Sequence, residues 1–374
     1  MKKDITLPLL TIGHFTIDLA CLYFYFTYFP QCGLVAGISA ALFYNFLAFA
    51  LQAPIGCFFD RFPARKSTSI GILFVLIGYI CGFCRLYAAG LMLCGFGNAF
   101  YHVGGSIGIA RIDAKGLRNS GIFVSAGALG VSLGTFLASG PGLSDLRRQA
   151  VTVFLVLFLL ILLVLQKRVR SSRHSALSPL PVKTTALLLL LSLLAVFIRS
   201  FGGLFFPSSY RLLFTLPGNG PLAIFLLAMA SGITAFLGKF MGGFLSNVCT
   251  AFFRNHTSWK SIDSRSGNYL SGILTLGIST LLLTFGGNIS LLCFLGILFF
   301  HAAMPVTLFE LYCILPDHPG FAMGLSTVML FLGYLPSTWI PPDTLPDSLI
   351  LCLLTLLATG CMAAAFLLYR RSRT

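Results

Sequence analysis

Apolar segments of about twenty residues follow one another along this chain of 374 residues. A membrane helix needs about 20 apolar residues, because the hydrocarbon core of a bilayer is roughly 30 Å thick. Hydrophobic residues make up 57% of the chain and charged residues 9%, whereas soluble domains have about 25% charged residues. We therefore predict an all-α polytopic membrane protein whose twelve transmembrane helices lie at approximately residues 5–29, 33–55, 67–86, 88–110, 119–140, 149–166, 184–206, 221–246, 267–286, 288–309, 320–340 and 347–369.

Most basic residues lie in the connections between these segments. With the N-terminus inside, 19 of the 25 Lys and Arg residues fall on the inner side, four in outer loops and two within predicted helices. Positively charged loops remain in the cytoplasm, so this asymmetry predicts a multi-pass protein with both termini cytoplasmic. We expect it in a prokaryotic-style inner membrane. The net charge of +15 then reflects topology, and we expect a lipid bilayer and no nucleic acid as partner.

The chain divides at residues 167–183, a basic stretch with Ser and Pro that separates six predicted helices from six. We predict two six-helix bundles, over residues 1–166 and 184–374, joined by this stretch as a cytoplasmic linker. In transporters built of two repeated bundles, the substrate path lies between the bundles, near the middle of the bilayer.

The two halves also share short sequence patterns. Phe100-Tyr101-His102 in the fourth segment matches Phe299-Phe300-His301 in the tenth. Gly56-x-x-x-Asp60 after the second segment matches Gly243-x-x-x-Asn247 after the eighth, where the acid has been lost. Nine residues after each histidine stands a charge, Arg111 or Glu310. We expect Glu310 to anchor a loop by pairing with Arg111 or Arg118.

The connection after the second segment carries a charged motif, made of Gly56, Asp60, Arg61, Arg65 and Lys66. It resembles the signature loop between helices 2 and 3 of the major facilitator superfamily, Gly-x-x-x-Asp-Arg/Lys-x-Gly-Arg-Arg/Lys, with the second basic pair one residue late. The resemblance implies the major facilitator fold, in which two bundles rock about a central site. It also implies that this loop is a gating loop, which holds the outward-open state through Asp60 and Arg61.

A narrower resemblance concerns the first and fourth segments. His14-Phe15-Thr16-Ile17-Asp18 and Phe100-Tyr101-His102, followed by small residues, resemble motifs of the fosmidomycin-resistance-like branch, with Val103 in place of a proline. The span 4 motif of drug–proton antiporters appears without its arginine, because Leu91 stands there.

Charged residues inside predicted helices are functional candidates, because burying a charge in a bilayer is costly. Asp18 lies about 20 Å along the first helix, near mid-depth, with His14 one turn away on the same face. We interpret Asp18 and His14 as a proton-coupling pair; the alternative is a structural pair that locks helices together. Arg199, at a similar depth in the seventh segment, is a candidate for binding an anion; alternatively, it neutralises Asp18.

Four further residues are candidates for substrate binding. Lys239 and Gln52 occupy repeat-related positions and could line the central cavity, although Lys239 could also extend to the interface. His102 and His301 are repeat-related too, and serve either in binding and proton relay or as satisfied core residues. The histidines and acids show no metal-site spacing, and the chain has no nucleotide-binding loop, so we expect neither metal nor cofactor.

The sequence therefore predicts a secondary active transporter rather than an enzyme. We expect proton-coupled efflux by an antiporter of an anionic or zwitterionic small molecule. Its partners would be the substrate and protons, or another coupling ion, and the protein would act as a monomer. Two alternatives stay open: an exporter of hydrophobic drugs, in which the 37 Phe residues would matter more than charge, and a membrane scaffold or sensor that transports nothing.

Overall fold

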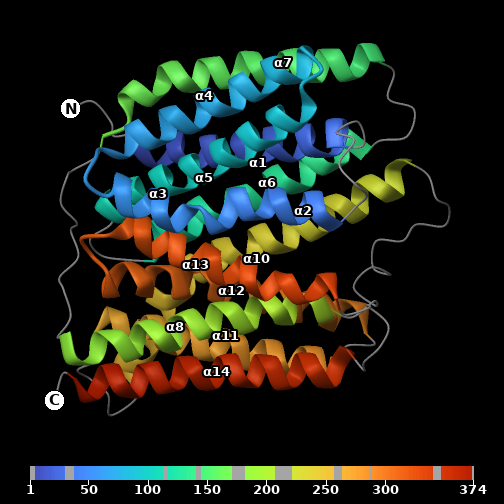
Figure 1. The fold of residues 1–374 in the computed structure, drawn as a ribbon. Helices are drawn as coiled ribbons and strands as arrows, with labels where there is room; N and C mark the ends of the chain where they lie inside the picture. Colours follow the sequence, from blue (N-terminus) through green and yellow to red (C-terminus); the bar gives the residue numbers. More distant parts are fainter. Residues whose placement is uncertain are drawn as a thin grey trace.

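The computed structural model describes residues 5–29, 38–112, 117–139, 145–170, 182–206, 221–256, 263–286, 289–339 and 347–372. Within these ranges the regular structure is helical throughout, as Figure 1 shows. The long helices are α1 (Thr6–Tyr28), α4 (Ala64–Phe83), α5 (Tyr87–Ile112), α6 (Arg118–Ser139), α7 (Asp145–Leu165), α8 (Val182–Gly202), α10 (Pro221–His256), α11 (Ser264–Gly286), α12 (Ser290–Ile314), α13 (Pro319–Tyr334) and α14 (Asp347–Arg371). A further rod joins α2 (Ile38–Asn45), the π-helical turn η2 (Phe46–Ala50) and α3 (Gln52–Phe59).

Each of the twelve predicted membrane segments corresponds to one of these helices or to the α2–α3 rod. Ten helices in the described ranges are long and apolar enough to cross a membrane, which supports a multi-pass membrane protein. The predicted ends were less accurate: α10 continues to His256 and α12 to Ile314, beyond the expected ends at 246 and 309. Helices are expected here, because only helices and closed barrels satisfy the backbone inside hydrocarbon.

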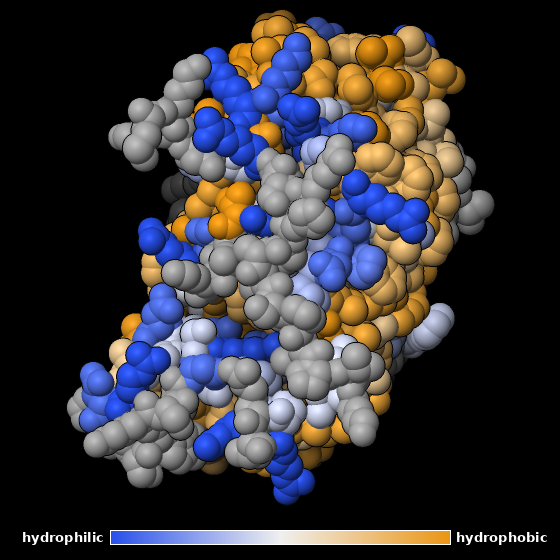
Figure 2. Space-filling view, turned by 90° about the vertical axis from the view of Figure 1, so that its left-hand side faces the viewer, coloured by the Kyte–Doolittle hydropathy of each residue, from blue (hydrophilic) through white to orange (hydrophobic). Residues whose placement is uncertain are grey.

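Lipid and water face different parts of the surface. Large apolar side chains such as Phe285, Leu157 and Leu353 are exposed along the outsides of helices, as lipid contact requires. Both termini lie at one end of the helix bundle, here called the termini end (Figure 1). Figure 2 looks onto this end and shows many hydrophilic side chains over it. Basic residues of the described part of this end include Arg61, Arg65, Lys66, Lys167, Arg168, Arg254, Arg370 and Arg371.

The two halves of the chain meet along two helix pairs, α6 with α10 and α3 with α13. Both crossings are very close at the termini end. A Cβ atom on Gly121 of α6 would lie 2.6 Å from the Cα of Gly243 on α10, and one on Gly56 would overlap the carbonyl of Gly320. Only glycine permits such backbone contact between membrane helices. Most of the predicted linker lies outside the described residues.

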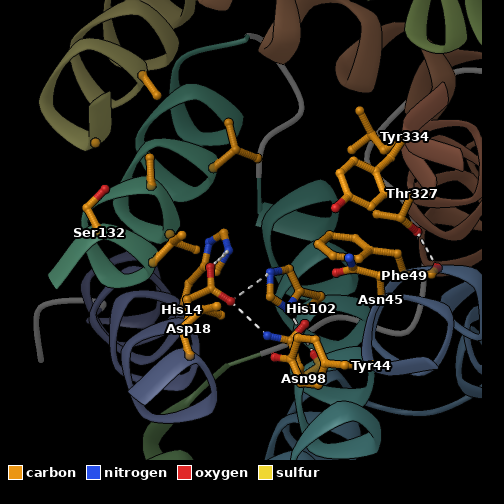
Figure 3. Close-up of a pocket in the computed structure, with 18 of the residues that line it drawn as sticks. His14, Asp18, Tyr44, Asn45, Phe49, Asn98, His102, Ser132, Thr327 and Tyr334 are labelled. Atoms are coloured by element: carbon orange, nitrogen blue, oxygen red, sulfur yellow. Dashed lines mark hydrogen bonds and ion pairs between the residues drawn. The ribbon is translucent and has the colours of Figure 1, made fainter. Parts of the chain in front are cut away.

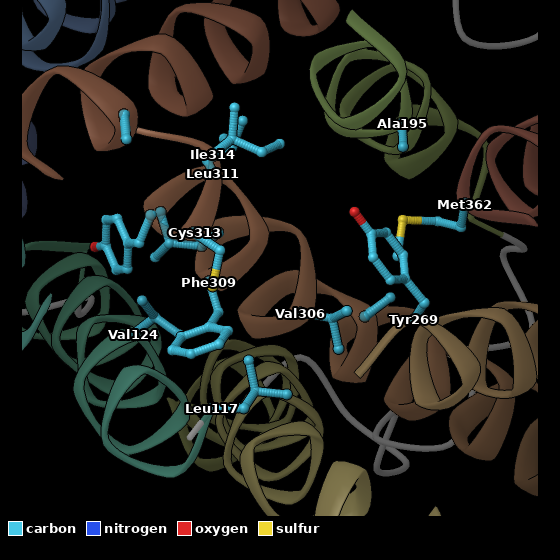
Figure 4. Packing of buried hydrophobic residues seen from close by; sticks show 14 of the residues in the cluster. Leu117, Val124, Ala195, Tyr269, Val306, Phe309, Leu311, Cys313, Ile314 and Met362 are labelled. Carbon is cyan, nitrogen blue, oxygen red and sulfur yellow. The ribbon is translucent and has the colours of Figure 1, made fainter. Parts of the chain in front are cut away.

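A hydrophobic cluster reinforces the contact between the halves (Figure 4). Leu117, just before α6, and Val124, within α6, belong to the same buried cluster as Phe309 of α12 and Tyr269 of α11. Burial of this cluster adds dispersion contacts across the interface, which membrane helices need because lipid supplies no hydrophobic drive for their association.

The expectation for Glu310 was wrong. It is fully buried on α12, and its carboxylate accepts a hydrogen bond of 2.8 Å from the Nε of Arg265 on α11. Arg111 instead donates to the backbone carbonyls of Phe62 and Asp60. The helix continues past Glu310, so the residue lies within α12 and not in a loop.

Candidate functional site

A cavity of about 650 Å³ lies between the two halves. Residues of α1, α2, η2, α5 and α6 line it from the first half, and residues of α10, α12 and α13 line it from the second. Its wall is largely apolar, with side chains such as Leu22, Phe49 and Met323, and has a small number of polar groups (Figure 3). This is the usual construction of a small-molecule site, in which apolar surface provides contact area and a few polar groups fix orientation.

Four polar side chains form a buried cluster on one wall of the cavity. His14 and Asp18 come from α1 and are one turn apart; Asn98 and His102 come from α5 and are also one turn apart. Nε2 of His14 lies 3.2 Å from Oδ2 of Asp18, and Nε2 of His102 lies 3.5 Å from Oδ1. Asn98 donates a 2.8 Å hydrogen bond to the same Oδ1. Figure 3 shows these groups converging on the Asp18 carboxylate.

The second nitrogen of each imidazole is bound to the backbone. Nδ1 of His14 lies 2.8 Å from the carbonyl oxygen of Phe123, and Nδ1 of His102 lies 2.9 Å from that of Asn98. A carbonyl only accepts, so both Nδ1 atoms carry a hydrogen. If both rings are neutral, both Nε2 atoms direct lone pairs at the carboxylate. One added proton, on an Nε2 or on the carboxyl group, replaces repulsion by a hydrogen bond. An added proton would therefore be shared between an imidazole and the carboxylate.

The space for this cluster depends on one glycine. A Cβ atom on Gly127 of α6 would overlap both Oδ2 of Asp18 and the His14 ring. The side-chain donor atoms of His14, Asp18 and His102 all lie within 4.8 Å of one another, which sequence spacing did not reveal. With Nε2 of both imidazoles unprotonated, these three side chains form a group that could hold a metal ion.

The second half of the chain contributes a cation to the cavity. Lys239 of α10 lines the cavity and is half-buried, and no described residue forms an ion pair with its ammonium group. Of the two alternatives for Lys239, lining the cavity or extending to the interface, the structure shows the first.

Arg199 of α8 and His301 of α12 lie outside the lining of the cavity. Arg199 is buried, with its guanidinium 5.3 Å from the ring centre of Phe300 and one N–H 3.4 Å from the hydroxyl of Thr307. Its Nε has no acceptor among the described residues. His301 packs against Phe300 and against Gly238 of α10. Arg199 forms no ion pair with Asp18, so the idea that it neutralises Asp18 was wrong.

Gln52 is also absent from the lining. Its side chain is fully buried near the crossing of α3 with α13, where its Nε2 donates a 2.7 Å hydrogen bond to the carbonyl of Ala48. A buried amide beside a helix crossing of this kind holds the local backbone geometry, here next to the π-helical turn η2.

The charged loop after α3 connects the halves at the termini end. Oδ1 of Asp60 accepts a 2.6 Å hydrogen bond from the N–H of Gly320, and Oδ2 accepts one of 3.0 Å from Phe321. Both donors belong to the first turn of α13, so the carboxylate sits at the positive end of the helix dipole. Burial raises the pKa of the Asp60 carboxyl, while the two N–H groups, His318 and Arg111 act in the opposite direction.

Arg61 takes no part in this contact. Its side chain is exposed, and no described residue hydrogen-bonds to it. Arg111 of α5 binds the loop instead, through the two carbonyl bonds already described. The expectation that Arg61 fastens the halves together was therefore wrong, whereas Asp60 does bridge them.

Sequence reasoning missed Asn98 and Arg111 as parts of these arrangements. Asn98 could have been found, because a polar amide one turn before His102 inside an apolar helix is unusual. Arg111 was identified only as a charge at a helix end. Its role depends on the position of the loop carbonyls, which no pattern in the sequence specifies.

No protein-family model and no curated protein matches the sequence. Solved structures do match the fold. A crystal structure of a single-residue variant of the E. coli fucose:proton symporter FucP aligns over 99% of both chains, with a TM-score of 0.63 and 13% identity. FucP in the outward conformation aligns over 98% of both, with a TM-score of 0.59 and 14% identity.

A bacterial homologue of the iron transporter ferroportin, in an outward-facing state, aligns over 98% of this chain and 99% of the other. Its TM-score is 0.55 and its identity 16%. These matches agree with the arrangement of twelve membrane segments around a cavity between two halves. The chain therefore has the fold of the major facilitator superfamily transporters.

Proposed function

We propose that this protein is a secondary active transporter that moves a small molecule across the membrane by alternating access. The observation that carries the proposal is the His14–Asp18–His102 cluster, which faces a cavity enclosed by both halves of the chain. Rocking the halves about this cavity would expose the same groups to each side of the membrane in turn.

Protons are the coupling ion that the cluster favours. Because both Nδ1 atoms are bound to carbonyls, adding or removing one proton changes the charge and the hydrogen bonding of the cavity wall directly. We assign proton coupling to Asp18 and His14, with His102 as the second imidazole that shares the proton. This assignment accounts for three polar side chains placed together at mid-membrane depth.

The gating loop supports an outward-facing state. With both termini in the cytoplasm, as the distribution of basic residues predicts, Asp60 and the α6–α10 and α3–α13 crossings close the cytoplasmic end. Opening that end requires loss of the two hydrogen bonds from α13 to Asp60. The neighbours described as outward-facing are consistent with this state.

The cavity favours a zwitterionic or anionic substrate. An acid-containing cluster from the first half and Lys239 from the second suit a molecule that carries both charges. Arg199, in the same half as Lys239, adds positive potential there, and no described acid forms an ion pair with it. In an inner membrane, this substrate would leave the cell in exchange for protons.

A hydrophobic compound is the second candidate. It is favoured by the largely apolar wall, to which Tyr25, Phe26, Phe49 and Met323 contribute. A lipophilic drug would use these side chains and would not need Lys239.

The test is a ligand screen by thermal unfolding in detergent, with amino acids, organic anions, sugars and lipophilic cations. A ligand that binds the native state raises the unfolding midpoint. We expect stabilisation by a zwitterion or anion, lost in Lys239→Gln, followed by proton-dependent flux of that compound in proteoliposomes. Stabilisation by lipophilic cations alone, retained in Lys239→Gln, would favour the drug exporter. Absence of flux for every stabilising ligand would contradict transport.

A further inference from the structure

A second pocket lies at the termini end, away from the central cavity. It has a volume of about 260 Å³ and is lined by Arg65, Lys66 and Ser69 from the first turns of α4 and by Gln166 and Lys167 after α7. The proposed transport mechanism uses none of the pocket's α7-side residues. Three of the five lining residues are cations, so the pocket is positively charged.

The cations of this pocket have no acidic partner in the described part of the chain. Arg65, Lys66 and Lys167 are all exposed, and no described acidic side chain forms an ion pair with any of them. The ammonium of Lys66 lies 4.7 Å from the ring centre of Phe62, which limits where it can point. Three cations held together without a counter-ion repel one another, so an anion bound among them would relieve that repulsion.

The floor of the pocket is rigid. Gln166 is almost fully buried, and its side-chain oxygen accepts a 2.8 Å hydrogen bond from the hydroxyl of Thr68 on α4. Ser67, one residue earlier, donates to the carbonyl of Phe100 on α5. The two helix ends that carry the cations are thereby held at a fixed separation, so the pocket does not depend on flexible loops.

Lipid-facing side chains continue from the pocket toward the membrane interior. On α4, Leu73 and Ile77 are exposed at one-turn intervals beyond Ser69. On α7, Val164 and Leu160 are exposed within the two turns before Lys167. A ligand with a phosphate group and acyl chains would therefore contact the cations with one end and these apolar side chains with the other.

We propose that this pocket binds the phosphate group of an anionic phospholipid at the cytoplasmic surface. Guanidinium and ammonium groups are suited to phosphate oxygens, and basic pockets between membrane helices on the cytoplasmic side bind anionic headgroups. Free phosphate shares the headgroup chemistry but would not use the apolar side chains of α4 and α7. Since Arg65 and Lys66 begin α4 a few residues after Asp60, a bound lipid would also hold the end of the gating loop against α7.

The test is native mass spectrometry of the full chain, purified in neutral detergent and mixed with phosphatidylglycerol and phosphatidylcholine of identical acyl chains. We expect preferential retention of phosphatidylglycerol, and a retention ratio about fivefold lower in Lys167→Gln and in Arg65→Gln. Arg168→Gln is the matched control, because Arg168 is the next residue, is exposed and does not line the pocket.

Three outcomes would overturn the proposal. Equal retention of the two lipids would remove the headgroup preference. An equal loss in Arg168→Gln would indicate general surface charge instead of a site. Displacement of phosphatidylglycerol by millimolar glycerol 3-phosphate, with equal affinity, would assign the pocket to a soluble phosphate. Circular dichroism of each variant checks that the fold is retained.

Discussion

At the scale of single residues, Asp18 carries the most specific prediction. Asp18→Asn removes the charge but keeps the size and one acceptor oxygen, so the bonds to Asn98 and His14 can largely re-form. We expect proton-driven flux to fall at least about tenfold, with little change in the unfolding midpoint. Flux in proteoliposomes under an imposed pH gradient measures this. Unchanged flux would exclude proton coupling through Asp18.

Asp60 gives a second prediction at the residue scale. Asp60→Asn leaves one side-chain oxygen for the two N–H groups of Gly320 and Phe321, and it removes the charge at the N-terminus of α13. The state closed at the termini end should lose about 1 kcal/mol relative to the open one, which is about fivefold in population. A reactive group placed in the cavity should therefore be labelled faster by a reagent added from the termini end. Arg61→Gln is the matched control, and an equal rise there would contradict the assignment.

At the scale of helices, the crossing of α6 with α10 depends on Gly121. In Gly121→Ala the new methyl group would meet the backbone of Gly243 at 2.6 Å, so the helices must separate. Overpacking of this kind costs about 1–3 kcal/mol, and the unfolding midpoint should fall.

Gly277→Ala on α11 provides the control for that crossing. A Cβ atom there meets nothing within 4 Å, and alanine favours a helix over glycine by about 1 kcal/mol in water. The midpoint should stay the same or rise. A similar decrease in both variants would mean that the effect arises from the helices themselves and not from the contact between the halves.

At the scale of the molecule, the predicted orientation places the termini end in the cytoplasm. A fluorescent protein fused after Thr374 should fluoresce, and alkaline phosphatase inserted in the short connection at Arg85 should be active. The reverse result would place Asp60 and the basic pocket outside the cell, and the structure would then be closed on the outer side.

The segments of the fold were predictable, because each apolar run had to become a helix inside lipid. Helix ends were less predictable: α10 continues for ten residues beyond its expected end, through residues 247–256, in which apolar and polar side chains are mixed. The pairing of His14 with Asp18 followed from their spacing of four residues. The position of His102 beside Asp18, and the pairing of Glu310 with Arg265, depend on how separate helices pack. The sequence pattern does not encode that packing.

Alternating access is the central claim, and distances between the two halves test it most directly. Spin labels carried by noncanonical amino acids, which leave the native cysteines in place, would report two pairs: Arg168 with Arg371 at the termini end, and Leu86 with Phe285 at the opposite end. The account predicts that, as pH changes, one distance lengthens while the other shortens, and that Asp18→Asn abolishes this response. If neither distance changes with pH, in the native chain or in Asp60→Asn, the account is contradicted.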